Sequence, residues 1–156
     1  MGFEAIYKQT VTVFNRKIVG DKTYWYPTVI PNVHLIIDRS IIISTYGEQA
    51  QDNAKLHIRY TPSGEGATIS VNGGTRSYMQ PKVYRASGVQ GKNITFAFGD
   101  DFDFIMEGAW SGDSAIDDDT YQKGFFNYMN KTYDNVFAIT TVAKFNLLTH
   151  FEITAR

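Results

Sequence analysis

The sequence predicts a mainly β protein: a small β-barrel or sandwich of about seven to eight mostly antiparallel strands with one helix. Apolar and polar residues alternate along most of the chain, which is typical of half-buried strands. Aromatic residues make up 15% of the chain, and they favour strands together with the many β-branched residues. A length of 156 residues suits one domain, so we expect residues 1–156 to form a single β-rich unit.

The first strands form an expected hairpin. Residues 8–15 alternate and lead through the turn residues 20–22 into a second alternating run, residues 23–30. Pro27 and Pro31 have no backbone N–H group to donate. The second strand should therefore be an edge strand, contain a bulge, or end at Pro31.

Two further strands are expected before the middle of the chain. Residues 33–44 form the first, and a bend or bulge at residues 38–40 would let its apolar phase change. Residues 45–53 are polar and are expected to form a loop. Residues 54–60 then alternate again, with aliphatic side chains inward and basic side chains outward.

The central segment is rich in glycine. Residues 61–77 are expected to form a small hairpin or exposed flap around the short apolar run 67–71. A helical turn is expected near residues 81–86. Residues 94–98 and 102–106 are two further strand-like runs.

One helix is expected near residues 117–133, followed by two closing strands over residues 135–144 and 149–155. Three aspartates at the start of the helix would cap free amides and complement the helix dipole. Its apolar face is expected to consist of residues spaced three and four apart, namely Phe125, Tyr128, Met129 and Thr132.

Charge is strongly segregated along the chain. The formal net charge of −1 argues against a general nucleic-acid binder. Residues 100–120 nevertheless contain eight carboxylates and no Lys or Arg: Asp100, Asp101, Asp103, Glu107, Asp113, Asp117, Asp118 and Asp119. Such a block can be a solvated face, a divalent-cation site or half of a charge-complementary protein contact. The spacing does not match an EF-hand.

Motifs for known chemistry are missing from the sequence. The chain has no cysteine, which excludes thiol nucleophiles, disulfides and thiolate metal sites. It also lacks a P-loop and a Gly-x-Ser-x-Gly nucleophile motif. His34, His57 and His150 all occupy polar strand positions and could form a patch across adjacent strands. Their spacing is not that of a chelate, so solvent-facing sheet histidines are the favoured interpretation. We therefore expect no catalytic residue, no metal and no cofactor.

Membrane attachment is not expected either. The longest aliphatic run, residues 41–43, is far shorter than the roughly 20 apolar residues that a membrane span needs. The first residues do not resemble a secretion signal. Tyr24, Trp25 and Tyr26 are consecutive, so they cannot all face inward, and at least one should lie at a surface or interface.

Several segments, in order along the chain, resemble a family of small virion proteins of tailed bacteriophages and prophages. These proteins are often uncharacterised or called minor capsid proteins, and they are similar to head-closure components. The segments that carry the resemblance are residues 25–30, 32–34, 46–47, 52–60, 104–108, 133–142 and 148–153.

This resemblance implies a non-enzymatic subunit of the neck, which joins the capsid portal to the tail and helps to retain packaged DNA. It implies a homo-oligomeric ring that contacts portal or adaptor proteins and tail proteins, with transient contact to DNA in the channel. The protein would be made in the bacterial host cytoplasm and lie at the head-to-tail junction of the virion. The expected interface residues are Asp100, Asp101, Asp103, Asp113, Asp117, Asp118, Asp119, Tyr24, Trp25 and Tyr26.

Three other functions are considered. A tail-terminator or tail-completion protein would have similar sequence features. A carbohydrate-binding β-sandwich could use the aromatic triplet at residues 24–26 as a stacking platform. An enzyme would require at least two of Asp101, Asp103 and Glu107 to converge in a cleft.

Overall fold

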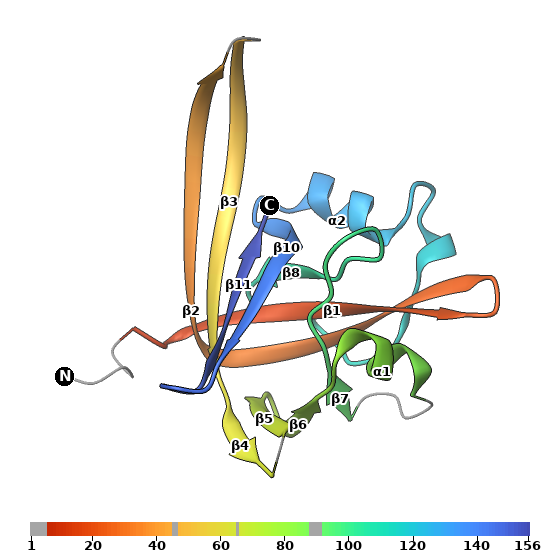
Figure 1. Cartoon of the computed structure of the whole chain (residues 1–156). Coiled ribbons are helices and arrows are strands. Elements are labelled where there is room, and N and C mark those ends of the chain that lie inside the picture. Colours follow the sequence, from red (N-terminus) through yellow and green to blue (C-terminus); the bar gives the residue numbers. More distant parts are fainter. Residues whose placement is uncertain (1–5, 45–46, 65, 88–91) are drawn as a thin grey trace.

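Six antiparallel strands close into a barrel in the order β1, β8, β10, β11, β3, β2 (Figure 1). The computed structural model describes residues 6–44, 47–64, 66–87 and 92–156. The barrel strands are β1 (Gln9–Val19), β2 (Lys22–Ser44), β3 (Gly47–Arg59), β8 (Phe104–Glu107), β10 (Val136–Phe145) and β11 (His150–Ala155). The predicted fold class, a small and mainly β barrel or sandwich, is confirmed.

A second, four-stranded sheet lies beside the barrel. Its strands are β4 (Thr61–Ser63), β5 (Gly66–Val71), β6 (Gly74–Tyr78) and β7 (Asn93–Ile94). The backbone N–H of Asn72 donates to the carbonyl of Val29 at 2.8 Å and ties this sheet to β2. The glycine-rich segment is therefore built from paired strands, with the buried residues Ala67 and Ile69 joining the barrel core.

The remaining described elements are short. Helix α1 (Pro81–Ala86) forms where a helical turn is predicted. Strand β9 (Ile116–Asp117) pairs with the start of β2, opposite Tyr24 and Trp25. A single 3-10 turn (Asp118–Thr120) and helix α2 (Phe125–Thr132) follow. None of the described helices is long and apolar enough to cross a membrane.

Strand β2 is one continuous strand of 23 residues, whereas the sequence predicts separate strands over residues 23–30 and 33–44. Of the three outcomes expected from Pro27 and Pro31, an end at Pro31 is not found, but an edge position and a bulge are. The predicted bend at residues 38–40 is also absent, because the described register with β3 is regular there. The bulge lies earlier: Gln9 is opposite Val33 while Val11 is opposite Ile30, so β2 has an extra residue at this point.

The bulge marks the change of partner along β2. Before it, β2 pairs with β1, and after it, β2 pairs with β3. Asn32 in the bulge has φ 57°, in the left-handed region that Asn tolerates better than most residues. Around Pro27, β2 pairs only with β1 among the described strands, so this proline lies on a sheet edge as expected.

The predicted polar loop at residues 45–53 is also wrong for the part that is described. Residues 47–53 belong to β3 and pair with β2 from Asp38 to Ser44, while residues 45–46 lie outside the described part. Polarity misleads here because pairing with β2, in a ribbon that extends beyond the barrel, makes these residues a strand (Figure 1).

Helix α2 is much shorter than predicted and begins at Phe125 instead of residue 117. Gly124 precedes it with φ 90°, a conformation that interrupts a right-handed helix. Phe125 and Met129 are buried as predicted, but Tyr128 and Thr132 are exposed. The closing strands β10 and β11 match their predicted ranges within one or two residues.

Two apolar clusters fill the interior. The larger lies inside the barrel and includes Val11, Leu56, Ile105 and Phe151, all of which have 0% exposed surface. The smaller cluster lies beneath α2, where Phe14 stacks on Phe104 with ring centroids 4.6 Å apart. These cores fix the barrel strands, and with them the side chains on the outer face.

Candidate functional site

Three histidines lie side by side on the outer face of the barrel, on strands β2, β3 and β11. His34 is opposite His57, and His57 is opposite Glu152. Side chains alternate between the two faces of a strand, so the buried neighbours Leu35, Leu56 and Phe151 force the histidines outward. We call His34, His57 and His150 the histidine row.

Aromatic contacts hold the rings of the histidine row in place. The centroid of the His57 ring lies 5.7 Å from those of both His34 and His150. His150 also stacks on Phe145 at 4.9 Å, and His34 meets the ring of Tyr7 edge-on at 6.2 Å. The three rings therefore form one packed series across three strands.

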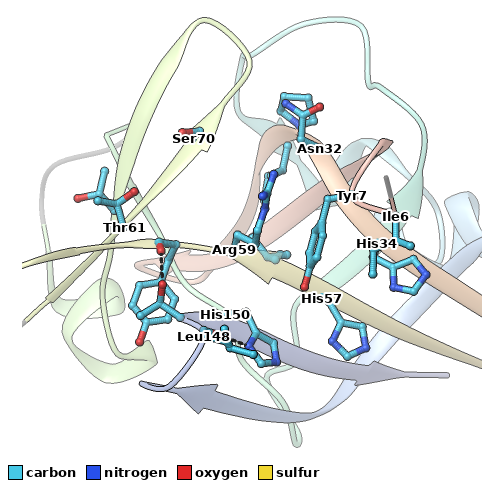
Figure 2. Close-up of a pocket in the computed structure, with 16 residues that line it drawn as sticks. Ile6, Tyr7, Asn32, His34, His57, Arg59, Thr61, Ser70, Leu148 and His150 are labelled. Atoms are coloured by element: carbon cyan, nitrogen blue, oxygen red, sulfur yellow. Dashed lines mark hydrogen bonds between the residues drawn. The ribbon is translucent and has the colours of Figure 1, made fainter. Parts of the chain in front are cut away.

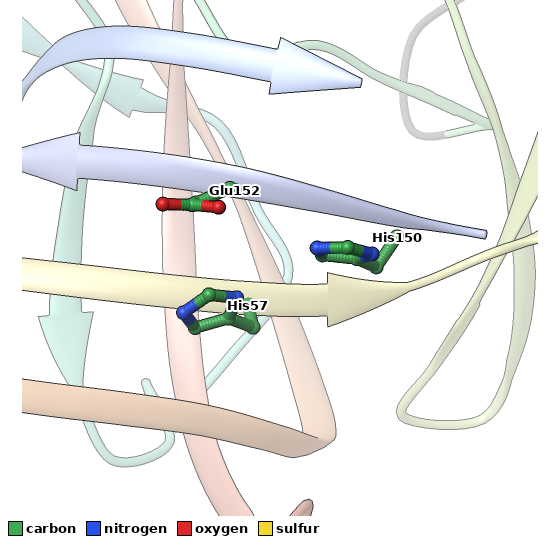
Figure 3. A group of neighbouring side chains, drawn as sticks. All are labelled: His57, His150 and Glu152. Carbon is green, nitrogen blue, oxygen red and sulfur yellow. The ribbon is translucent and has the colours of Figure 1, made fainter. Parts of the chain in front are cut away.

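Glu152 completes a cluster of possible metal ligands with two members of the row. One donor atom each from His57, His150 and Glu152 lies within 4.8 Å of the others (Figure 3). All three side chains are half-buried. Two imidazoles and a carboxylate are a donor set that suits zinc and its neighbours among the transition metals.

A hydrogen bond fixes the ring of His150, and burial favours the neutral form of His57. Nδ1 of His150 lies 2.5 Å from the carbonyl oxygen of Leu148, and its N–H donates a hydrogen bond to that oxygen. Burial is the main cause that lowers the pKa of His57, assisted by the neighbouring His150 and His34, while Glu152 acts in the opposite direction.

A pocket of about 760 Å³ adjoins the histidine row (Figure 2). Its lining includes all three histidines together with Tyr7, Arg59 and Thr61. Tyr7 lies between Arg59 and His34, with the guanidinium carbon of Arg59 4.6 Å from the centre of the Tyr7 ring. The cluster is thus open to a volume that could admit a small ligand.

The sequence places the histidines in the correct strand phase but does not bring them together. His57 and Glu152 become neighbours only through the pairing of β3 with β11. The possibility of a patch across adjacent strands is realised, and the favoured interpretation as separate solvent-facing side chains is incomplete. Bringing them together depends on the order of the strands in the sheet, and the spacing of residues in the sequence does not reveal that order.

The aromatic triplet has its central ring inside the protein. Trp25 is 1% exposed and packs against Phe104 with ring centroids 4.9 Å apart, while Tyr24 and Tyr26 are half-buried. Burial removes Trp25 from any surface, so the triplet cannot offer a carbohydrate the three-ring stacking platform considered from the sequence.

Four of the seven predicted interface aspartates have partners inside the chain. Asp101 forms ion pairs with Arg16 and Arg85 at 3.9 and 3.8 Å, and Asp117 forms one with Lys22 at 3.5 Å. Asp118 and the fully buried Asp103 accept hydrogen bonds described below. The remaining three are exposed: Asp100, Asp113 and Asp119.

Asp103 is part of the interior and is not a surface carboxylate. Its Oδ1 accepts from the backbone N–H of Arg16 at 2.8 Å, and its Oδ2 accepts from Asn15 Nδ2 and the N–H of Ala97, both at 2.9 Å. Burial raises its pKa to about 7, and the three donors act against this rise. Asp101, Asp103 and Glu107 line neither of the two described pockets, so they form no catalytic cleft there.

Comparison with known proteins provides a family but no function. No curated protein and no solved structure matches the chain significantly. Residues 6–156 match the sequence family DUF6751, a family of unknown function, and this match includes every described strand and helix. The chain therefore belongs to the DUF6751 family.

Proposed function

We propose that this protein is a non-enzymatic virion subunit of the head-to-tail junction of a tailed bacteriophage. It forms a ring that joins the portal to the tail and helps to retain packaged DNA. The sequence resemblance suggests the phage neck, and one structural observation supports assembly: strands β2 and β3 continue beyond the closed barrel as an isolated ribbon (Figure 1).

The ribbon has two open edges. Residues 38–44 of β2 and 47–53 of β3 pair only with each other among the described strands. A two-stranded ribbon alone is only marginally stable in water, and open edges readily pair with another chain. A neighbouring copy that covers these edges would stabilise the ribbon. Such a head-to-tail contact, repeated around an axis, generates a ring.

Exposed charge of both signs supports the same type of contact. Asp100, Asp113 and Asp119 are exposed in the acidic segment, while Lys55 on β3 and Lys144 on β10 are exposed on strands next to β11. When one surface of a subunit meets a different surface of the next, opposite charges favour the correct pairing.

The turn between β10 and β11 adds an apolar contact. Leu147 is 87% exposed and Leu148 is 67% exposed. Adjacent leucines at a turn contribute nothing to the barrel core, and exposed apolar residues that lie together often mark protein contacts. In the proposed ring they lie against the next subunit.

The first test asks whether the protein is part of the particle. An induced lysate is separated on a density gradient, and complete particles, free heads and free tails are analysed by mass spectrometry. We expect the chain at a small fixed copy number in complete particles and on DNA-filled heads. Its presence on free tails alone would instead assign the tail-terminator or tail-completion role, and its absence from all three fractions would refute a virion role.

The second test removes the ribbon. Asp38 lies opposite Asn53, so an Asn-Gly turn can replace residues 39–52 and close the shortened hairpin. The pairing of β3 with β11 begins at Ala54 and is retained. We expect a folded monomer that fails to form rings and fails to join heads to tails. Normal joining by this variant would show that the ribbon is not the assembly element.

A third test separates surface charge from folding. Lysine substitution of Asp100, Asp113 and Asp119 should prevent the joining of heads to tails while leaving the melting temperature of the monomer nearly unchanged. Reversal of residues 117–119 is a poorer test, because Asp118 bonds to Trp25 and Phe125 within the fold. Normal particle assembly by the first variant would contradict a contact through this surface.

A further inference from the structure

We propose that His57, His150 and Glu152 form a mononuclear binding site for a divalent transition metal, with zinc as the best-fitting ion. The site lies on the outer face of strands β3 and β11 and is independent of the proposed role in the phage neck (Figure 3).

The barrel positions the three ligands before any metal binds. His57 is directly opposite Glu152 in the antiparallel pairing, and Arg59 is opposite His150, so His150 is diagonal to His57. Neighbouring strands lie about 4.8 Å apart, a separation that two side chains can bridge with one ion. Residues before, between and after the ligands, namely Leu56, Ile58, Phe151 and Ile153, are buried in the core and hold both strands rigidly.

The donor distances suit a tetrahedral ion after a small side-chain adjustment. Zinc bonds of about 2.0 Å to nitrogen and oxygen place neighbouring donors about 3.3 Å apart. The donor atoms here lie within 4.8 Å of one another, and rotation of χ angles in the half-buried side chains can close the difference. Three protein ligands leave a fourth position for water or another ligand, next to the pocket that His57 and His150 line.

Contacts around the ligands favour metal binding by the imidazoles. The Nδ1–H of His150 donates a hydrogen bond to the carbonyl of Leu148, so the Nε2 atom keeps a free lone pair. The His150 ring lies between those of Phe145 and His57, which keeps it beside His57.

The donor chemistry selects among cations. Calcium and magnesium prefer sets of oxygen ligands, whereas two imidazoles with one carboxylate suit zinc and similar ions. Glu152 supplies the negative charge, and it lies beside exposed Lys55 and Arg59 on β3, which act against a cation. Affinity should therefore depend strongly on Glu152.

The experiment uses the full chain without an affinity tag, after removal of metal by a chelator. Cobalt(II) is titrated while visible absorption is recorded, and zinc is then added in competition. We expect one cobalt per chain, the strong visible bands of tetrahedral coordination, and their loss on addition of one equivalent of zinc. No saturable binding, or octahedral spectra only, would overturn the proposal.

Variants locate the site. His57→Gln, His150→Gln and Glu152→Gln should each weaken zinc binding by at least about tenfold. His34→Gln is the matched control, since His34 stacks on His57 but lies outside the ligand group, and it should bind zinc as the parent does. Unchanged binding in all three ligand variants would place any metal elsewhere and refute the site.

Folding and assembly are tested separately from metal binding. Circular dichroism of the metal-free variants should match the parent, because the substituted side chains lie on the outer face. Zinc should raise the melting temperature of the parent and of His34→Gln but not of the ligand variants. Equal stabilisation of all proteins would also refute the site, whatever the result of the particle experiments.

Discussion

The indole Nε1 of Trp25 donates a 2.8 Å hydrogen bond to Oδ1 of Asp118, although the two residues are separated by most of the chain. The same oxygen accepts from the backbone N–H of Phe125, the first residue of α2, also at 2.8 Å. One carboxylate thus fixes the buried indole and the start of the helix together. Asp118 has a structural role that its position in an acidic run does not reveal.

Replacement of this carboxylate should destabilise the fold. In Asp118→Ala the indole and a helical N–H lose their acceptor, which should lower the free energy of unfolding by about 1–3 kcal/mol. Asp119→Ala is the control, because Asp119 is exposed, and its effect should stay within about 0.5 kcal/mol. Urea unfolding followed by tryptophan fluorescence measures both. Equal stability of the two variants would contradict the assigned role of Asp118.

Asp103 should make stability depend on pH. Its pKa is raised from 3.8 to about 7 in the fold, mainly by burial, so the folded state holds this proton over a range in which the unfolded state has lost it. The stabilising contribution of protonated Asp103 is complete below about pH 4. It falls by up to about 1.4 kcal/mol per pH unit until about pH 7.

The variant Asp103→Asn removes this titration. The amide NH2 group cannot accept a hydrogen bond, so one of the N–H donors of Arg16, Asn15 and Ala97 loses its acceptor. The variant should therefore be less stable than the parent at pH 5. The deficit should shrink at pH 8, because only the parent then holds a buried charge. Urea unfolding at both pH values measures the difference, with exposed Asp100→Asn as control. A deficit that is the same at both pH values would contradict the raised pKa.

The bulge in β2 should require a residue that tolerates positive φ. Asn32 has φ 57° and an exposed side chain, so Asn32→Ala mainly adds backbone strain and should cost about 1 kcal/mol. Asn32→Gly should be close to neutral. Thermal unfolding compares the two, and equal destabilisation would indicate that the asparagine side chain matters instead of the backbone.

The turn between β10 and β11 stores similar strain at Leu148, which has φ 51°. Leu148→Asn should raise the free energy of unfolding by up to about 1 kcal/mol, since Asn tolerates this conformation better. Leu147→Asn removes the neighbouring exposed leucine, but Leu147 is not in the left-handed region, so this variant should gain no stability. Urea unfolding of both variants measures their free energies of unfolding. No difference between the two variants would argue against strain at Leu148.

Local patterns in the sequence determined much of this fold. The mainly β class, the first hairpin, the α1 turn and the ranges of β10 and β11 follow from alternation and turn residues. The same alternation predicts that Leu56 and Ile58 point inward and that His57 points outward. Alternation with a period of two acts between nearby residues of one strand, so it can be recognised without knowing the partner strand.

Tertiary structure decided what depends on a partner. Residues 47–53 form a strand because β2 offers them a pairing edge, and β2 passes Pro31 because its partner changes from β1 to β3. Asp103 is buried because Asn15, Arg16 and Ala97 satisfy its oxygens, although the nearby Asp100 and Asp101 are exposed. The cluster of His57, His150 and Glu152 exists only in the register of β3 with β11. Register is a relation between distant segments, and closure of the barrel sets it.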